Sequence, residues 1–187
     1  MSYFADYWNG VSQTLQAVRD QESMIQGIAE TILSAERVFV VGNGGSMSTA
    51  MHFAEDLLTA GVRALAISDP AYLTMAGNDY GFSHAFVPFI QNQVTERDVV
   101  VGISTSGNSS NVMNALIAHQ GARIGLIGRA NSVMRRYCQL FIELNVEETL
   151  RGTKLAEDAH LIICHAISEW CKVEVQRRAK TPALETA

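Results

Sequence analysis

Cysteine, clustered positive charge and long apolar runs are all scarce in this sequence, and each scarcity excludes a class of protein. Three cysteines, Cys138, Cys164 and Cys171, have neither metal-binding nor disulfide spacing, so we expect a reducing, cytoplasmic compartment. The formal net charge is −5 and no basic patch stands out, which argues against direct binding of nucleic acid. No apolar run approaches membrane-spanning length, and the N-terminus lacks the pattern of a signal peptide.

The sequence also lacks linkers, repeats and low-complexity tracts, so its 187 residues predict a single domain with a substantial core. Residues 1–34 have helical periodicity and predict an N-terminal helical arm, and residues 179–187 form a polar tail. Between them, residues 35–178 alternate short apolar runs with helical patterns. This alternation predicts an α/β three-layer sandwich around a five-stranded parallel sheet of the flavodoxin or Rossmann type.

The expected boundaries follow from where each pattern changes. The predicted strands are 37–41, 62–67, 98–103, 122–127 and 140–144. The predicted helices are 48–59, 71–76, 82–93, 109–119, 132–137 and 154–178, with a loop at 147–153.

A loop rich in hydroxyl groups follows the third predicted strand. Its hydroxyl side chains belong to Ser104, Thr105, Ser106 and Ser109. The loop leads into a helix, whose free backbone N–H groups and positive dipole end favour an anion. Because the loop has no Lys or Arg, it is better suited to a phosphate monoester than to a nucleoside triphosphate. The alternative is a simple Ser/Thr turn with a helix N-cap.

A second loop of this kind follows the first predicted strand and contains Asn43, Gly44 and Gly45. Its glycine spacing is not that of a dinucleotide-binding fingerprint, so we expect no nucleotide cofactor. A tight strand-to-helix turn would explain the glycines equally well. Both loops nevertheless lie at the carboxyl ends of parallel strands, where ligands of such sheets bind.

Histidine and carboxylate side chains on two predicted helices are candidates for chemistry. His52 and Asp56 are four residues apart and share a helix face, which suits a metal site, an acid–base pair or a simple surface ion pair. His165 lies among apolar residues, so we expect it to be partly buried, either as a core histidine or as a catalytic one. Glu157 is eight residues before His165, about 12 Å along a helix, too far for both to bind one metal ion unless a second subunit or the substrate bridges them.

Several segments together resemble the sugar isomerase (SIS) domain family and, within it, the bacterial phosphoheptose isomerases. The matching segments are 42–46, 50–55, 66–69, 77–82, 102–109 and the C-terminal helix with His160 and His165.

This resemblance implies a homotetramer with active sites between subunits, and conversion of sedoheptulose 7-phosphate to a heptose 7-phosphate through an enediol. It assigns sugar contacts to Asn43, Gly44, Gly45, Asn78 and Asp79, and phosphate contacts to Ser104, Thr105, Ser106 and Ser109. It assigns the acid–base groups to Asp56 and His165; our hypothesis is that Asp56 or Glu157 is the base and His165 the acid, or the reverse. Many family members bind zinc through the positions that match His52, Asp56, Glu157 and His165.

The sequence departs from the family pattern at the catalytic centre. Asp56 stands where the family has a glutamate, Glu157 stands where it has a glutamine, and the connection at 57–61 lacks an insert with Arg and Pro. Two alternatives therefore stand beside heptose isomerisation. One is an isomerase for a different phosphosugar. The other is a non-catalytic tetramer that senses sugar phosphates or binds a protein such as a replication initiator.

Overall fold

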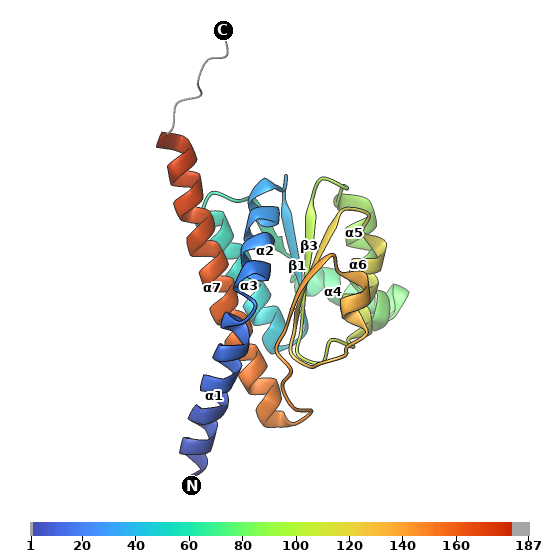
Figure 1. Cartoon of the computed structure of the whole chain (residues 1–187). Helices are drawn as coiled ribbons and strands as arrows, with labels where there is room; N and C mark the ends of the chain where they lie inside the picture. The colour runs from blue at the N-terminus through green and yellow to red at the C-terminus, as the bar shows by residue number, and fades with distance from the viewer. Residues whose placement is uncertain (1, 181–187) are drawn as a thin grey trace.

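The computed structural model describes residues 2–180, and it shows one parallel sheet between two layers of helices (Figure 1). The strands are β1 (Val38–Val41), β2 (Ala64–Ala66), β3 (Val99–Ser104), β4 (Ala122–Ile127) and β5 (Leu140–Glu143), in the spatial order β2-β1-β3-β4-β5. The helices are α1 (Tyr3–Arg19), α2 (Glu22–Ser34), α3 (Gly45–Thr59), α4 (Pro70–Tyr80), α5 (Val87–Gln93), α6 (Ser110–Ala118) and α7 (Leu150–Lys180), with short 3₁₀ turns η1 (Phe82–His84) and η2 (Met134–Tyr137). The predicted fold class is confirmed.

Helices cover both faces of the sheet, and side chains along each strand alternate between the two faces. In β1, Val38 and Val40 belong to the core under α2, α3 and α7, whereas Phe39 and Val41 belong to the core under α5 and α6. This two-sided burial explains why the strands read as continuous apolar runs.

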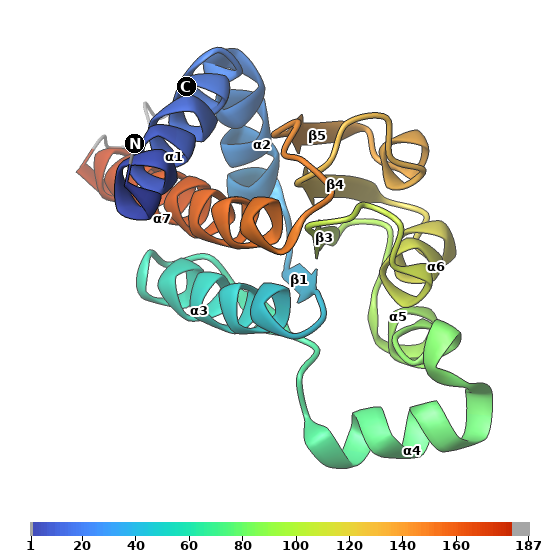
Figure 2. The ribbon, with the colours of Figure 1, turned by 90° about the horizontal axis from the view of Figure 1, so that it is seen from below.

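The sheet has its topological switch point between β1 and β3. The chain leaves β1 into α3 on one face and leaves β3 into α6 on the opposite face (Figure 2). Backbone pairing between the two strands ends at Val41 and Gly102. The two loops that follow therefore separate at the edge where ligands of such sheets bind.

Helix boundaries differ from the predictions at several helices, and α3, for example, begins at Gly45 rather than at residue 48. Helix α4 continues through Gly77 to Tyr80, because Asp69 caps its start and Pro70 suits its first turn, so the predicted stop at Gly77 was wrong. The predicted helix 82–93 is divided into η1 and α5. Helix α7 begins at Leu150, within the predicted loop, and ends at Lys180, so most of the predicted tail lies outside the described residues.

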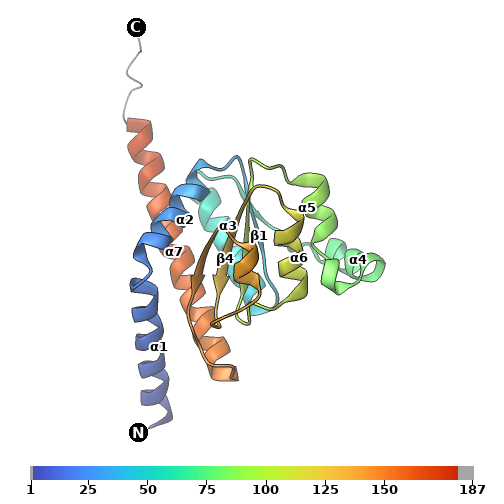
Figure 3. The same ribbon diagram turned by 45° about the vertical axis from the view of Figure 1, so that its right-hand side comes forward.

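Helix α7 is the longest element and packs against α1, α2 and α3 (Figures 1 and 3). It is parallel to α3: Glu157 lies at Gly45, His165 lies at His52, and Val175 lies at Gly61. Within residues 2–180, neither α7 nor any other helix is long and apolar enough to cross a membrane.

Candidate functional site

Three of the four predicted hydroxyl groups of the β3–α6 loop converge on one another, and Thr105 beside them is partly buried. Ser104 Oγ lies 3.4 Å from Ser106 Oγ and 3.2 Å from Ser109 Oγ, and it accepts the N–H of Gly107 at 3.0 Å. Ser109 is the N-cap residue of α6, but its side chain makes no capping bond. Its hydroxyl group therefore remains within the loop, beside the N–H groups that begin α6, of which that of Val112 is bonded to the Asn111 side chain.

Residues immediately before η2 and at its start form hydrogen bonds to this loop. Asn108 Oδ1 accepts the N–H of Val133 at 3.0 Å, and the Gly107 carbonyl accepts the N–H of Met134 at 3.0 Å. Gly107 has a φ of +61°, and a Cβ atom there would collide with the side chain of Ser132. Only glycine fits this position without strain.

Gly107→Ala should lower the free energy of unfolding by about 2–4 kcal/mol, because it adds left-handed strain and a steric clash. It should also weaken binding of inorganic phosphate. Urea denaturation and calorimetry measure the two effects. The matched control is Gly27→Ala in α2, where a Cβ meets nothing within 4 Å; it should stabilise by about 0.5–1 kcal/mol. Equal stability of the two variants would contradict the strain at Gly107.

The β1–α3 loop brings the other predicted sugar contacts to the same edge. Gly44 has a φ of +54° and is the N-cap residue of α3. The side chains of Asn43 and Asn111 exchange two hydrogen bonds across the switch point. Glu157 reaches this loop from α7, since a Cβ atom on Gly45 would collide with the Glu157 carboxylate. The β1–α3 loop, predicted to contact the sugar, and the β3–α6 loop, predicted to bind phosphate, are thus adjacent, and we call them the sugar-side loop and the phosphate-side loop.

His52, Asp56 and His165 form a compact triad between α3 and α7. His52 Nε2 is 3.4 Å from His165 Nε2, and Asp56 Oδ2 is 3.6 Å and 3.7 Å from these two nitrogens. In a tetrahedral zinc site with bonds of about 2.0–2.1 Å, neighbouring ligand atoms are about 3.3–3.4 Å apart. Two imidazoles and one carboxylate therefore have the chemistry and the spacing of a three-ligand metal group.

His165 is not a core histidine, the first of the two alternatives. Its side chain is 47% exposed, because successive residues on α7 are about 100° apart and its neighbours Cys164 and Ile163 face the core instead. The fully buried histidine of this helix is His160.

The remaining predicted residues lie apart from the triad. Glu157 forms an ion pair of 3.2 Å with Lys154 and lies against Gly45, so the structure does not bring it to His165. Asn78 and Asp79 are exposed on the last turn of α4, where the Asn78 amide donates to the Asp79 carboxylate at 2.8 Å. Figure 2 shows α4 set apart from the sheet, next to α5.

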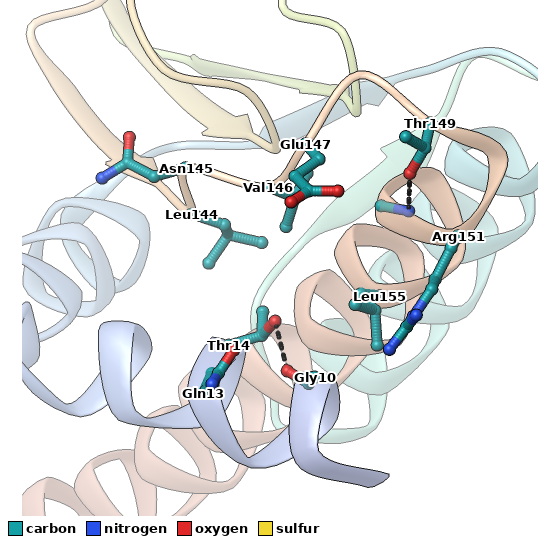
Figure 4. Close-up of a pocket in the computed structure, with 11 residues that line it drawn as sticks. Gly10, Gln13, Thr14, Leu144, Asn145, Val146, Glu147, Thr149, Arg151 and Leu155 are labelled. Carbon is teal, nitrogen blue, oxygen red and sulfur yellow. Dashed lines mark hydrogen bonds between the residues drawn. The ribbon is translucent and has the colours of Figure 1, made fainter. Parts of the chain in front are cut away.

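Two cavities are candidate places for a bound ligand. One, of about 250 Å³, adjoins the triad and is lined by Asp56 and His165, together with Thr59, Ala60, Ser168, Glu169 and Lys172. The other, of about 400 Å³, lies between α1, the segment after β5 and the start of α7 (Figure 4). No histidine and none of the predicted site residues lines this second cavity.

Two contributions escaped the sequence analysis. Asn111, which is buried in the first turn of α6, pairs with Asn43, and residues 132–134 contact the β3–α6 loop. Neither follows a spacing rule, because each depends on contacts between distant segments.

Known proteins match most of this chain. The SIS domain family matches residues 6–128. The phosphoheptose isomerase of Geobacter sulfurreducens is 36% identical over 157 residues, which cover 79% of this chain and 81% of that protein. The phosphoheptose isomerase of Fusobacterium nucleatum is 32% identical, covering 81% and 80% of the two chains. The structure of the phosphoheptose isomerase from Neisseria gonorrhoeae superimposes with a TM-score of 0.80 at 29% identity, covering 89% of this chain and 96% of that one.

Proposed function

Because the chain belongs to the SIS domain family and, within it, to the phosphoheptose isomerases, we propose that it converts sedoheptulose 7-phosphate to a heptose 7-phosphate. The observation that carries this proposal is the convergence of His52, Asp56 and His165 in a fold that also presents a hydroxyl-lined anion loop.

The β3–α6 loop binds the phosphate group through the hydroxyl groups of Ser104, Thr105, Ser106 and Ser109 and the N–H groups that begin α6. The phosphate is remote from the carbons that react. Its binding energy therefore serves to orient the sugar. Asn43, Gly44 and Gly45 contact the sugar from the β1–α3 loop, and Asn78 and Asp79 contribute from α4.

Moving the carbonyl between C2 and C1 requires a base that removes a proton from one carbon and an acid that protonates the developing oxyanion. Asp56 and His165 are the proposed acid–base pair, since both line the 250 Å³ cavity and their polar atoms are 3.7 Å apart. Proton transfer through an enediol then returns the proton to the neighbouring carbon. Glu157, at the other end of the α3–α7 contact, is the alternative base at the sugar-side loop.

The triad fits zinc, with His52, Asp56 and His165 as ligands and a fourth position open. Zinc bound there would polarise the carbonyl oxygen of the substrate, and because Asp56 Oδ2 and His165 Nε2 would then be its ligands, the alternative base Glu157 would take over the proton transfer. Glu157 completes the ligand set only through a rearrangement or through a second chain, because its carboxylate lies at Gly45.

We further propose a cytoplasmic homotetramer with active sites between subunits. Along α3, His52 and Asp56 lie about 10 Å and 16 Å beyond Gly45, so the triad of one chain is remote from its own sugar-side loop. The side chains of His52 and His165 are also about half exposed, and the same two helices, α3 and α7, expose the apolar side chains of Met51, Leu58, Ile162 and Val173. A second chain would cover this surface and exclude water from the reaction.

The test is turnover of sedoheptulose 7-phosphate by the purified protein, followed by NMR, with added zinc and with a chelator. Product that forms with zinc and disappears with chelator supports the metal-assisted isomerase. Product in both conditions supports an isomerase that does not need the metal. Binding without turnover would indicate a different phosphosugar or a sensor, and neither binding nor turnover would favour a protein-binding scaffold.

A further inference from the structure

We propose that Asn111 is a positioning residue, which fixes the side-chain amide of Asn43 in the orientation that the sugar requires. This inference rests on the proposed isomerase function. It assigns a role to a residue that does not itself reach the substrate, because Asn111 is only 1% exposed.

The two side chains form a closed pair of hydrogen bonds. Asn43 Nδ2 donates to Asn111 Oδ1 at 2.8 Å, and Asn111 Nδ2 donates to Asn43 Oδ1, also at 2.8 Å. Asn111 Oδ1 accepts a further bond from the N–H of Val112 at 3.0 Å. Since a backbone N–H can only donate, this third bond determines which atom of Asn111 is the oxygen, and therefore which atom of Asn43 is the nitrogen.

The pair lies at the switch point of the sheet, where backbone pairing has ended. The last paired residues of β1 and β3 are Val41 and Gly102, and Asn43 follows Val41 by two residues. Beyond that point the chain turns into α3 on one face and into α6 on the other. The two amides thus connect the sugar-side loop to the helix that begins at the phosphate-side loop.

A side-chain amide is planar and offers two N–H groups and two acceptor lone pairs. Asn111 occupies one of each on Asn43, so the remaining N–H and lone pair of Asn43 point away from Asn111, and this side chain is only partly buried. A sugar hydroxyl group both donates and accepts, so it matches this free edge. Without Asn111, the amide could rotate by half a turn and exchange its donor and acceptor.

The experiment compares Asn111→Leu with Asn114→Leu. Both substitutions keep a branched, uncharged side chain on α6, but Asn114 donates to the carbonyl of Ser83, away from the two loops. For N111L we expect kcat/KM for sedoheptulose 7-phosphate to fall about a hundredfold, as for a misplaced contact, while the Kd for inorganic phosphate stays within about twofold of its original value. N114L should retain both values.

A double-mutant cycle tests whether the two amides act as one unit. If Asn111 acts through Asn43, N43L/N111L should lose no more kcat/KM than N43L alone. Three results would each overturn the proposal: losses of kcat/KM that multiply in the double variant, a loss of phosphate affinity as large as the loss of kcat/KM, or an unchanged kcat/KM in N111L. If N111L does not fold, Asn111→Ser replaces it, because a serine hydroxyl is too short to reach Asn43 but can still accept the N–H of Val112.

Failure of the isomerase function can be distinguished from failure of this inference. If the wild-type protein binds sedoheptulose 7-phosphate without turnover, the isomerase function fails and the Kd for the sugar phosphate replaces kcat/KM in the same comparison. An affinity that N111L lowers and N114L does not would still support the positioning role, and equal affinities would overturn it. A wild-type protein that does not bind the sugar phosphate overturns both.

Discussion

His165→Gln should reduce kcat for sedoheptulose 7-phosphate by about 10²–10⁴-fold, the usual contribution of a positioned general acid or base. Glutamine keeps polar atoms at this position but does not exchange a proton near neutral pH. The Kd for inorganic phosphate should change little, because the triad lies along α3 and α7 rather than at the β3–α6 loop. Steady-state kinetics and calorimetry measure the two quantities.

His84→Gln is the matched control for this variant. His84 is an exposed histidine in η1. Within residues 2–180 its ring forms a hydrogen bond with the hydroxyl group of the neighbouring Ser83 alone, so H84Q should keep full activity. A kcat for H165Q within about threefold of the wild-type value would exclude the acid–base role of His165.

Acidification should destabilise the protein through His160. Burial lowers the pKa of His160 to about 4. Within residues 2–180 neither ring nitrogen has a hydrogen-bond partner, and the nearby Ile127 carbonyl raises the pKa by less than burial lowers it. The unfolded chain binds a proton below pH 6.5, whereas the folded chain binds it only near pH 4. Stability is therefore lost as the pH falls through this window, by about 3 kcal/mol in all and about 2 kcal/mol between pH 7 and pH 5.

Urea denaturation at pH 7 and pH 5 measures this loss in the wild-type protein and in His160→Phe. The variant should lose about 2 kcal/mol less than the wild type between the two pH values, whatever its absolute stability. H84Q should retain the wild-type dependence, since His84 is exposed. The same pH dependence in H160F as in the wild type would show that another group is responsible.

Much of the fold could be predicted, because most positions of the parallel strands are buried and each helix has one apolar face. The strand Val99–Ser104 is an example: it is buried along its whole length, and its sequence is correspondingly an apolar run. Local rules failed where a helix boundary depends on its surroundings. Gly77 did not end α4, because the capped start of that helix outweighs one unfavourable residue in its interior.

Residue spacing in the sequence predicted only part of the site. The interval of four residues predicted that His52 and Asp56 share a face, but it could not predict that His165 joins them from 113 residues away. That meeting depends on how α7 packs on α3, and the resemblance to a family, rather than local pattern, pointed to it. The same packing carries Glu157 to Gly45, a position that helical spacing alone does not give.

The parallel contact between α3 and α7 also bears on how this protein tolerates changes in length. Inserting or deleting one residue between Glu157 and His165 would turn one end of α7 by about 100° and shift it by about 1.5 Å relative to the other. One such change would separate Glu157 from Gly45 or His165 from His52, whichever end moved, although every functional side chain would still be present. We therefore expect natural variants to exchange residues within these two helices and to gain or lose residues in the connections, such as the short one between α3 and β2.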